Sequence, residues 1–192
     1  MARNLEFDEQ DVIKKAMDVF WKKGYNGATM RDLTAAMDIN ASSLYRSFGD
    51  KHALFVKCIK NYAEARIEEA KRFAINQESP LDALESFIYL SASVITGGKD
   101  SCLALKTTFE IADTDPDIQK IVKADHDFTH YFILCLLNRA IAEGTIKPLA
   151  DIETMTDHIT SAFTGWHESY ILHKDSARVT NMAHLLIQQL KN

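Results

Sequence analysis

The chain has 192 residues, with 46% hydrophobic and 26% charged residues, a composition typical of folded domains rather than of a disordered chain. Its three cysteines are widely spaced and form no CxxC pair, which argues against a disulfide scaffold and favours a reducing compartment. The first ten residues lack the apolar core of a signal peptide, and the longest apolar run, residues 131–137, is far shorter than the roughly 20 residues of a membrane span. We therefore expect a cytoplasmic protein that does not bind membranes.

The net charge of −5 does not by itself indicate a nucleic-acid-binding protein, but its distribution is uneven. Residues 1–60 carry 10 basic and 8 acidic side chains, whereas residues 61–192 carry 12 and 19. A mildly basic N-terminal part on an acidic remainder is compatible with DNA contact through the N-terminal part alone.

Apolar residues recur with a period near 3.6 along almost the whole chain, and no segment alternates like a strand. The first helix is expected to begin after Asp8, a good N-cap residue, and to end at Gly24. The second should begin at Thr29, which has capping-box spacing to Asp32. A short break then leads to a third helix over residues 41–48.

The fourth predicted helix, residues 51–75, is long, about 38 Å at ~1.5 Å per residue, and can join two parts of the molecule mechanically. Glycine, proline and aspartate residues divide the remainder into helices near residues 81–96, 101–112, 116–143, 150–172 and 176–190. The predicted fold is all-α, with about nine helices.

Two short helices that follow a longer one have the outline of a helix-turn-helix. In the third helix, Leu44 and Phe48 mark the buried side, and the opposite side is small and polar. Small residues allow a helix to enter the major groove, and serine, tyrosine and arginine supply hydrogen-bond donors. Thr29 and Lys51 stand at helix N-termini, which favour phosphate. Taken singly, each of these features also has an ordinary structural explanation. The Ser/Asn cluster can serve only as a helix cap, Tyr45 can be a half-buried aromatic residue, and Lys51 can be a solvated lysine.

Residues 9–56 carry a dense motif: Ala16-(x)3-Phe20-(x)3-Gly24-Tyr25-(x)3-Thr29-Met30-Arg31-Asp32-Leu33, then Ile39-Asn40-(x)3-Leu44-Tyr45-(x)2-Phe48-(x)2-Lys51-(x)2-Leu54. This motif closely resembles the N-terminal domain of TetR/AcrR-type transcriptional repressors. The chain departs from the family pattern at Asp38, where glycine is usual in the turn; aspartate tolerates the left-handed conformation better than most residues.

The resemblance implies an N-terminal three-helix DNA-binding domain (residues 1–50) and a C-terminal helical domain (residues 51–192) for effector binding and dimerisation, with residues 51–75 as the linking helix. It also implies a homodimeric repressor that binds a palindromic operator in double-stranded DNA and is released by a small molecule, without a cofactor or enzymatic activity. Phosphate contacts are expected from Thr29, Tyr45 and Lys51, and base contacts from Arg31 and residues 40–46. The full predicted DNA-binding set is Thr29, Arg31, Asn40, Ala41, Ser42, Ser43, Tyr45, Arg46, Ser47 and Lys51.

Two further sets of residues are predicted in the C-terminal part. Aromatic and polar residues at or beside the helix stripes are candidates for an effector pocket: Cys102, Phe109, Glu110, Asp125, Phe128, Phe132, Phe163, Trp166, His167 and Tyr170. Apolar residues of the last two helices are candidates for a four-helix dimer interface: Ile159, Phe163, Trp166, Val179, Met182 and Leu186. An ordinary intrachain core explains both sets as well.

Several alternatives remain open at this point. Cys102 is either a small core residue or a reactive thiol. His126 and His130 have the i, i+4 spacing of some metal sites, but the sequence shows no third ligand, and we predict no metal. The competing classes of function are an all-α enzyme, for which no recognised catalytic motif is present, and a helical ligand carrier that does not bind DNA.

Overall fold

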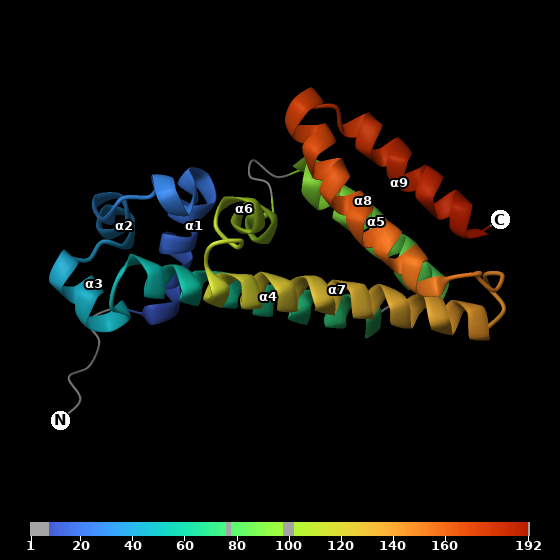
Figure 1. The fold of residues 1–192 in the computed structure, drawn as a ribbon, viewed down its shortest axis with the longest axis horizontal. Coiled ribbons are helices and arrows are strands. Elements are labelled where there is room, and N and C mark those ends of the chain that lie inside the picture. The colour runs from blue at the N-terminus through green and yellow to red at the C-terminus, as the bar shows by residue number, and fades with distance from the viewer. Residues whose placement is uncertain (1–7, 76–77, 98–101, 192) are drawn as a thin grey trace. The chain divides into compact units, whose positions relative to one another are not determined.

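A computed structural model describes residues 8–75, 78–97 and 102–191, and these residues form nine α-helices and no strand (Figure 1). The helices are α1 (Glu9–Gly27), α2 (Met30–Met37), α3 (Ala41–Phe48), α4 (Lys51–Ile75), α5 (Pro80–Gly97), α6 (Leu103–Glu110), α7 (Pro116–Ala142), α8 (Ile152–His173) and α9 (Ser176–Lys191). The all-α prediction is confirmed. Residue 101, the expected first residue of the sixth helix, lies outside the described residues.

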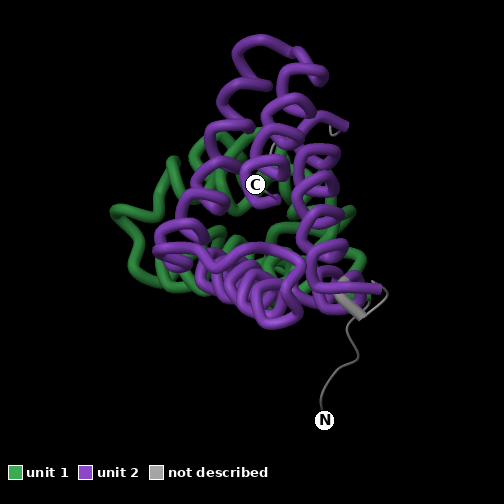
Figure 2. Tube along the Cα trace, turned by 90° about the vertical axis from the view of Figure 1, so that its right-hand side faces the viewer, with its two compact units in different colours: residues 1–66, 102–124 green, residues 67–101, 125–192 purple. Residues whose placement is uncertain are grey.

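The helices gather into two compact units, each with its own core (Figure 2). Unit 1 comprises residues 1–66 and 102–124, and unit 2 comprises residues 67–101 and 125–192. The helices α4 and α7 each pass from one unit to the other. Unit 1 is therefore larger than the predicted three-helix domain of residues 1–50, because α6 and the beginning of α7 pack with α1 to α4.

The core of unit 1 is built around the aromatic residues of α1 and α4. Phe20 is fully buried, and its ring lies 4.7 Å from that of Phe55 in an edge-to-face arrangement. Leu44 and Phe48 from α3 enter the same cluster, as their spacing predicted. Burial of one such side chain contributes about 1.5–3 kcal/mol. These two residues therefore hold α3 on unit 1 through one face of the helix.

Unit 2 is a helical bundle in which α5 packs against both α8 and α9. Its core contains Ile88, Ile133, Ile159 and Val179, which are completely shielded from solvent. Among the helices that the structure describes, none has the length and hydropathy to span a membrane.

Candidate DNA-binding site

The helix α3 presents a polar face to solvent. Asn40 caps its N-terminus by accepting a hydrogen bond from the backbone N–H of Ser43 (2.8 Å). Beyond this cap, exposed positions of the predicted DNA-binding set are Ala41, Ser42, Tyr45 and Arg46, whereas Ser43 and Ser47 are half-buried. Tyr45 is 54% exposed, which is unusual for a large aromatic residue that has no external partner.

The turn between α2 and α3 is tight because Asp38 adopts the left-handed conformation (φ 54°, ψ 42°). Its backbone N–H bonds the carbonyl of Thr34 and so ends α2. The expectation that aspartate replaces the usual glycine without losing this geometry is confirmed.

The N-terminus of α2 has a complete capping box. The Thr29 hydroxyl accepts a bond from the Asp32 N–H (3.1 Å) and donates to the Asp32 carboxylate (2.7 Å). Asp32 also forms an ion pair with Lys23 (2.6 Å), and the bonds from Lys23 and Thr29 hold the pKa of this carboxyl far below its ordinary value. Since the Thr29 hydroxyl is occupied, a phosphate at this helix would be bound by free N–H groups of the first turn. Arg31, in that turn, is exposed.

The N-terminus of α4 places a basic side chain over an aromatic ring. Asp50 caps the helix by accepting a bond from the Ala53 N–H (2.8 Å). The Lys51 ammonium lies 4.6 Å from the centroid of the Tyr25 ring, and Lys51 is half-buried rather than freely solvated. Burial, followed by the charges of Asp115 and Asp50, raises the pKa of Tyr25, so this residue remains neutral at physiological pH. The contact fixes the Lys51 charge beside α4's N-terminus.

The helix α6 is bonded to the end of α1, a contact that sequence reasoning missed. The two carboxylate oxygens of Glu110 accept hydrogen bonds from the backbone N–H groups of Tyr25 (2.9 Å) and Asn26 (2.7 Å). One turn earlier, Lys106 donates to the carbonyl of Trp21 (2.7 Å). Glu110, predicted in an effector pocket, therefore stabilises the chain where α1 bends at Gly24.

Comparison with known proteins assigns this architecture. Residues 12–58 match the profile of the bacterial regulatory proteins of the tetR family, and residues 80–186 match that of the tetracyclin repressor-like C-terminal domain. The chain belongs to the TetR family. It is thus a transcriptional regulator rather than an enzyme.

Individual TetR-family proteins are similar over most of the chain. The HTH-type transcriptional repressor ComR of Escherichia coli is 26% identical over 164 residues, which cover 83% of this chain and 77% of ComR. The fold is shared with a cysteine mutant of CifR in complex with 26-bp operator DNA, at a TM-score of 0.84, 21% identity and coverage of 97% of this chain and 98% of CifR. It is also shared with Bacillus subtilis FadR in complex with stearoyl-CoA, at a TM-score of 0.78, 14% identity and coverage of 96% and 98%.

The residues predicted to form the effector pocket of this TetR-family chain fall into both units. Cys102, Phe109 and Glu110 lie in unit 1, where Phe109 is 75% exposed and Cys102 lies 3.4 Å from the Tyr62 hydroxyl. The others lie in unit 2, where four aromatic rings form two pairs: Phe132 stacks with Phe128 (6.1 Å), and Phe163 contacts Trp166 (5.3 Å). Phe87 joins the two pairs into one cluster of five rings, at 5.0 Å from Phe132 and 6.0 Å from Phe163. The remaining members of the predicted set, Tyr170, Asp125 and His167, are half-buried in the first case and buried in the other two.

Most residues predicted at the dimer interface lie in the chain's own core. Ile159, Trp166, Val179 and Leu186 are at most 4% exposed within a single chain, and Phe163 and Met182 pack against the same cluster. The intrachain alternative therefore accounts for their apolar stripe. On the same two helices, large apolar side chains remain exposed at Ile171 (51%), Leu172 (68%) and Leu185 (56%).

Proposed function

We propose that this TetR-family regulator is a homodimeric repressor that binds a near-palindromic operator. The exposed polar face of α3 carries the proposal, because a short helix fixed by Leu44 and Phe48 presents small and hydrogen-bonding side chains outward. In a twofold dimer, the two copies of α3 would enter successive major grooves about 34–36 Å apart. Such a protein acts where the DNA is, in the cytoplasm.

The exposed apolar residues of α8 and α9 support dimerisation. Three large side chains, Ile171, Leu172 and Leu185, are more than half exposed on these two helices. Their burial against a second copy of the chain would follow the isologous arrangement usual in homodimers. A second copy also provides the second recognition helix that a palindrome requires.

A small apolar or aromatic molecule is the proposed effector. The aromatic cluster of unit 2, built from Phe87, Phe128, Phe132, Phe163 and Trp166, offers ring faces and edges for stacking. FadR, which shares the fold, binds the long-chain ligand stearoyl-CoA. An effector that binds better to a dimer conformation in which the two copies of α3 are wrongly spaced for the operator would release DNA. A coupling free energy of about 1–3 kcal/mol between the effector and DNA sites lowers operator affinity roughly 5- to 150-fold.

DNA binding is tested by fluorescence anisotropy with the promoter region upstream of the chain's own gene, at several salt concentrations. Tyr45→Ala and Lys51→Ala should weaken binding to all DNA and reduce the salt slope, by about 1 for each phosphate that the variant no longer binds. Arg31→Ala should change the preferred base pairs instead. The matched controls are Lys60→Ala, an exposed lysine of α4, and Tyr131→Ala, an exposed tyrosine of α7.

Operator affinity that is unchanged in both Tyr45→Ala and Lys51→Ala would contradict the assignment of α3 and α4 to the DNA interface. Failure of the wild-type chain to bind its promoter region specifically would favour a ligand carrier that does not bind DNA. Thermal unfolding of each variant separates the removal of a DNA-binding side chain from damage to the fold.

A further inference from the structure

A hydrogen bond joins the first turn of α4 to the residue that caps α7, within unit 1. The Nε2 atom of His52 lies 2.7 Å from Oδ2 of Asp115, and the two side chains are 37% and 19% exposed. Burial opposes ionisation of this carboxyl, but hydrogen bonds from Ile118, His52 and Asp117 outweigh it and lower the pKa of Asp115. Because an ionised carboxylate can only accept hydrogen bonds, Nε2 of His52 carries the proton.

Asp115 is a fixed point of unit 1. Its other oxygen, Oδ1, accepts hydrogen bonds from the backbone N–H groups of Asp117 and Ile118 (both 3.1 Å), as in a helix N-cap. Ile118 is completely buried, and it belongs to the same core as Leu54 of α4. The Asp115 carboxylate is thus held by its own helix, and its second oxygen is a fixed acceptor for His52.

His52 adjoins a part of unit 1 that carries proposed DNA-binding side chains. Lys51 precedes it in α4, and the Lys51 ammonium lies 4.6 Å from the centroid of the Tyr25 ring. The His52 ring meets the same Tyr25 ring in an edge-to-face arrangement, with 6.4 Å between the centroids. Only residues 49 and 50 separate α4 from Phe48, the last residue of α3. A displaced first turn of α4 would therefore move Lys51 and the end of α3.

We propose that His52 is a positioning residue for operator binding, because its hydrogen bond to Asp115 holds the first turn of α4 where Lys51 meets a phosphate. This inference rests on the proposed role of Lys51 in DNA binding. A hydrogen bond to an ionised acceptor is roughly twice as strong as one between neutral groups. Without it, the Lys51 side chain must be ordered when DNA binds, which lowers the affinity about three- to tenfold.

The same side chains do not have the spacing of a metal site. The ligand atoms of His52, Asp115 and Asp117 lie within 4.8 Å of one another. Ligand atoms around tetrahedral Zn²⁺ are separated by about 3.3–3.4 Å, whereas His52 and Asp115 are in contact at a hydrogen-bond distance. The helices α4 and α7 also both begin here, and the positive ends of their dipoles disfavour a cation. A chelator should therefore leave DNA binding unchanged.

The test measures the affinity of the full-length chain for a random-sequence duplex and for the promoter region upstream of its own gene. Fluorescence anisotropy at several salt concentrations gives both the affinity and the salt slope. His52→Ala should weaken binding to both duplexes about three- to tenfold and lower the salt slope. His52→Gln should restore both, because the glutamine amide is a hydrogen-bond donor without a charge.

A change in the acceptor tests the same bond from the other side. Asp115→Ser keeps a good N-cap residue on α7 but leaves no second oxygen for His52, so it should weaken DNA binding as His52→Ala does. Removal of an acidic charge would by itself strengthen DNA binding. The direction of the change therefore distinguishes positioning from general electrostatics.

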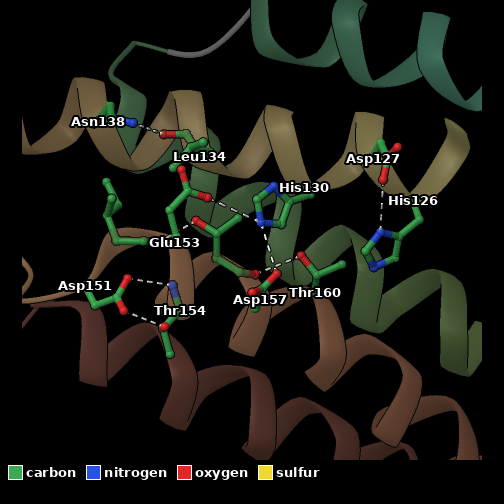
Figure 3. A network of polar contacts seen from close by, with 12 residues as sticks. His126, Asp127, His130, Leu134, Asn138, Asp151, Glu153, Thr154, Asp157 and Thr160 are labelled. Atoms are coloured by element: carbon green, nitrogen blue, oxygen red, sulfur yellow. Dashed lines mark hydrogen bonds and ion pairs between the residues drawn. The ribbon is translucent and has the colours of Figure 1, made fainter. Parts of the chain in front are cut away.

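A second histidine–carboxylate pair supplies the matched control. In unit 2, Nε2 of His130 lies 3.1 Å from Oδ1 of Asp157, and Figure 3 shows this pair between α7 and α8. His130 lies outside the proposed DNA-binding set, so His130→Ala should leave the affinity for both duplexes unchanged. In a Lys51→Ala background, His52→Ala should add little or no further loss, because His52 acts through Lys51.

Wild-type affinity in both His52→Ala and Asp115→Ser would overturn the proposal, as would an equal effect of His52→Ala with and without Lys51. A His52→Gln protein that binds as weakly as His52→Ala would also overturn it, and would assign to His52 a direct phosphate contact. So would DNA binding that a chelator weakens. If Lys51→Ala alone leaves binding unchanged, the proposed role of Lys51 is wrong, and that single variant identifies this failure. Thermal unfolding shows that each variant is folded in the assay.

Discussion

Replacement of Gly24 by alanine should destabilise unit 1 strongly. The backbone at Gly24 has φ 73° and ψ 172°, a conformation that side-chain-bearing residues adopt very rarely. An added Cβ would also lie 2.7 Å and 2.9 Å from the two carboxylate oxygens of Glu110. Alanine must therefore change the backbone, displace Glu110, or both.

The magnitude follows from these two effects. Holding a non-glycine residue in a rare backbone region costs about 1–3 kcal/mol. Displacement of Glu110 breaks its hydrogen bonds to the N–H groups of Tyr25 and Asn26, and a bond to a charged group contributes about 1.5–3 kcal/mol where it is shielded from water. Because Asn26 is exposed, water replaces part of this stabilisation. We expect the free energy of unfolding to fall by about 2–5 kcal/mol.

Urea unfolding of Gly24→Ala, Gly27→Ala and the double variant Gly24→Ala/Glu110→Ala measures both effects. Gly27 is the control: its added Cβ would meet only Lys23 Cβ at 3.7 Å, an ordinary contact, and alanine there should stabilise by about 0.4–1 kcal/mol. Without the Glu110 side chain, Gly24→Ala should cost the backbone strain alone. Equal effects at Gly24 and Gly27, or strictly additive effects of Gly24→Ala and Glu110→Ala, would refute the reasoning.

Three further predictions concern titration, thiol reactivity and assembly. Because folding lowers the pKa of Asp32, the ionised carboxylate stabilises the folded state fully above the ordinary carboxyl pKa of about 4, and this stabilisation is lost as the pH falls toward the lowered pKa. Urea unfolding should therefore show that Asp32→Asn is less stable than wild type at pH 7, with a smaller difference at pH 3. Burial raises the pKa of Cys58 to about 12, so iodoacetamide at pH 8 should label Cys102 and Cys135 but not Cys58, as mass spectrometry can check. Leu185→Glu should shift sedimentation from dimer to monomer without lowering the thermal midpoint of the monomer; an unchanged dimer would exclude this face.

The helix boundaries of the N-terminal domain were predictable because they depend on contacts between residues that are close in the chain. The capping residues Asp8 and Thr29 act within three residues of their own positions, and the structure shows both caps. Gly24 interrupts α1 where its sequence position suggested, although one further helical turn continues to Gly27. In each case the interacting groups are close in the chain, so the pattern alone contains the information.

Contacts between distant segments were not predictable in the same way. Glu110 bonds backbone N–H groups that are 84 and 85 residues away, and backbone groups leave no signature in a sequence. For the same reason, the pairing of His130 with Glu153 and Asp157 needed the packing of α7 on α8. A polar residue beside an apolar stripe indicated a constrained site, but its partner came only from the fold.

The apolar stripes of α8 and α9 show a related limit. Periodicity identifies the buried face of a helix, but it does not tell whether the same chain or a second copy covers that face. Ile159 and Val179 are fully shielded by their own chain, while Leu185, which lies outside the predicted interface, is 56% exposed. The residues that remain exposed after the chain's core has formed are the ones that a partner must cover.

The contact between α6 and α1 leads directly to a side chain of the proposed DNA-binding set within unit 1. Glu110 holds the backbone of Tyr25, and the Tyr25 ring lies under the Lys51 ammonium at 4.6 Å. A displaced Glu110 therefore removes a fixed support from the residue that positions Lys51, without any change in a residue of the proposed DNA-binding set. For this reason Gly24→Ala should weaken binding to specific and non-specific DNA alike and lower the salt slope, as is also expected of Lys51→Ala. Full operator affinity in a Gly24→Ala protein that is destabilised as expected would show that α1 and α6 support the fold but not the placement of Lys51.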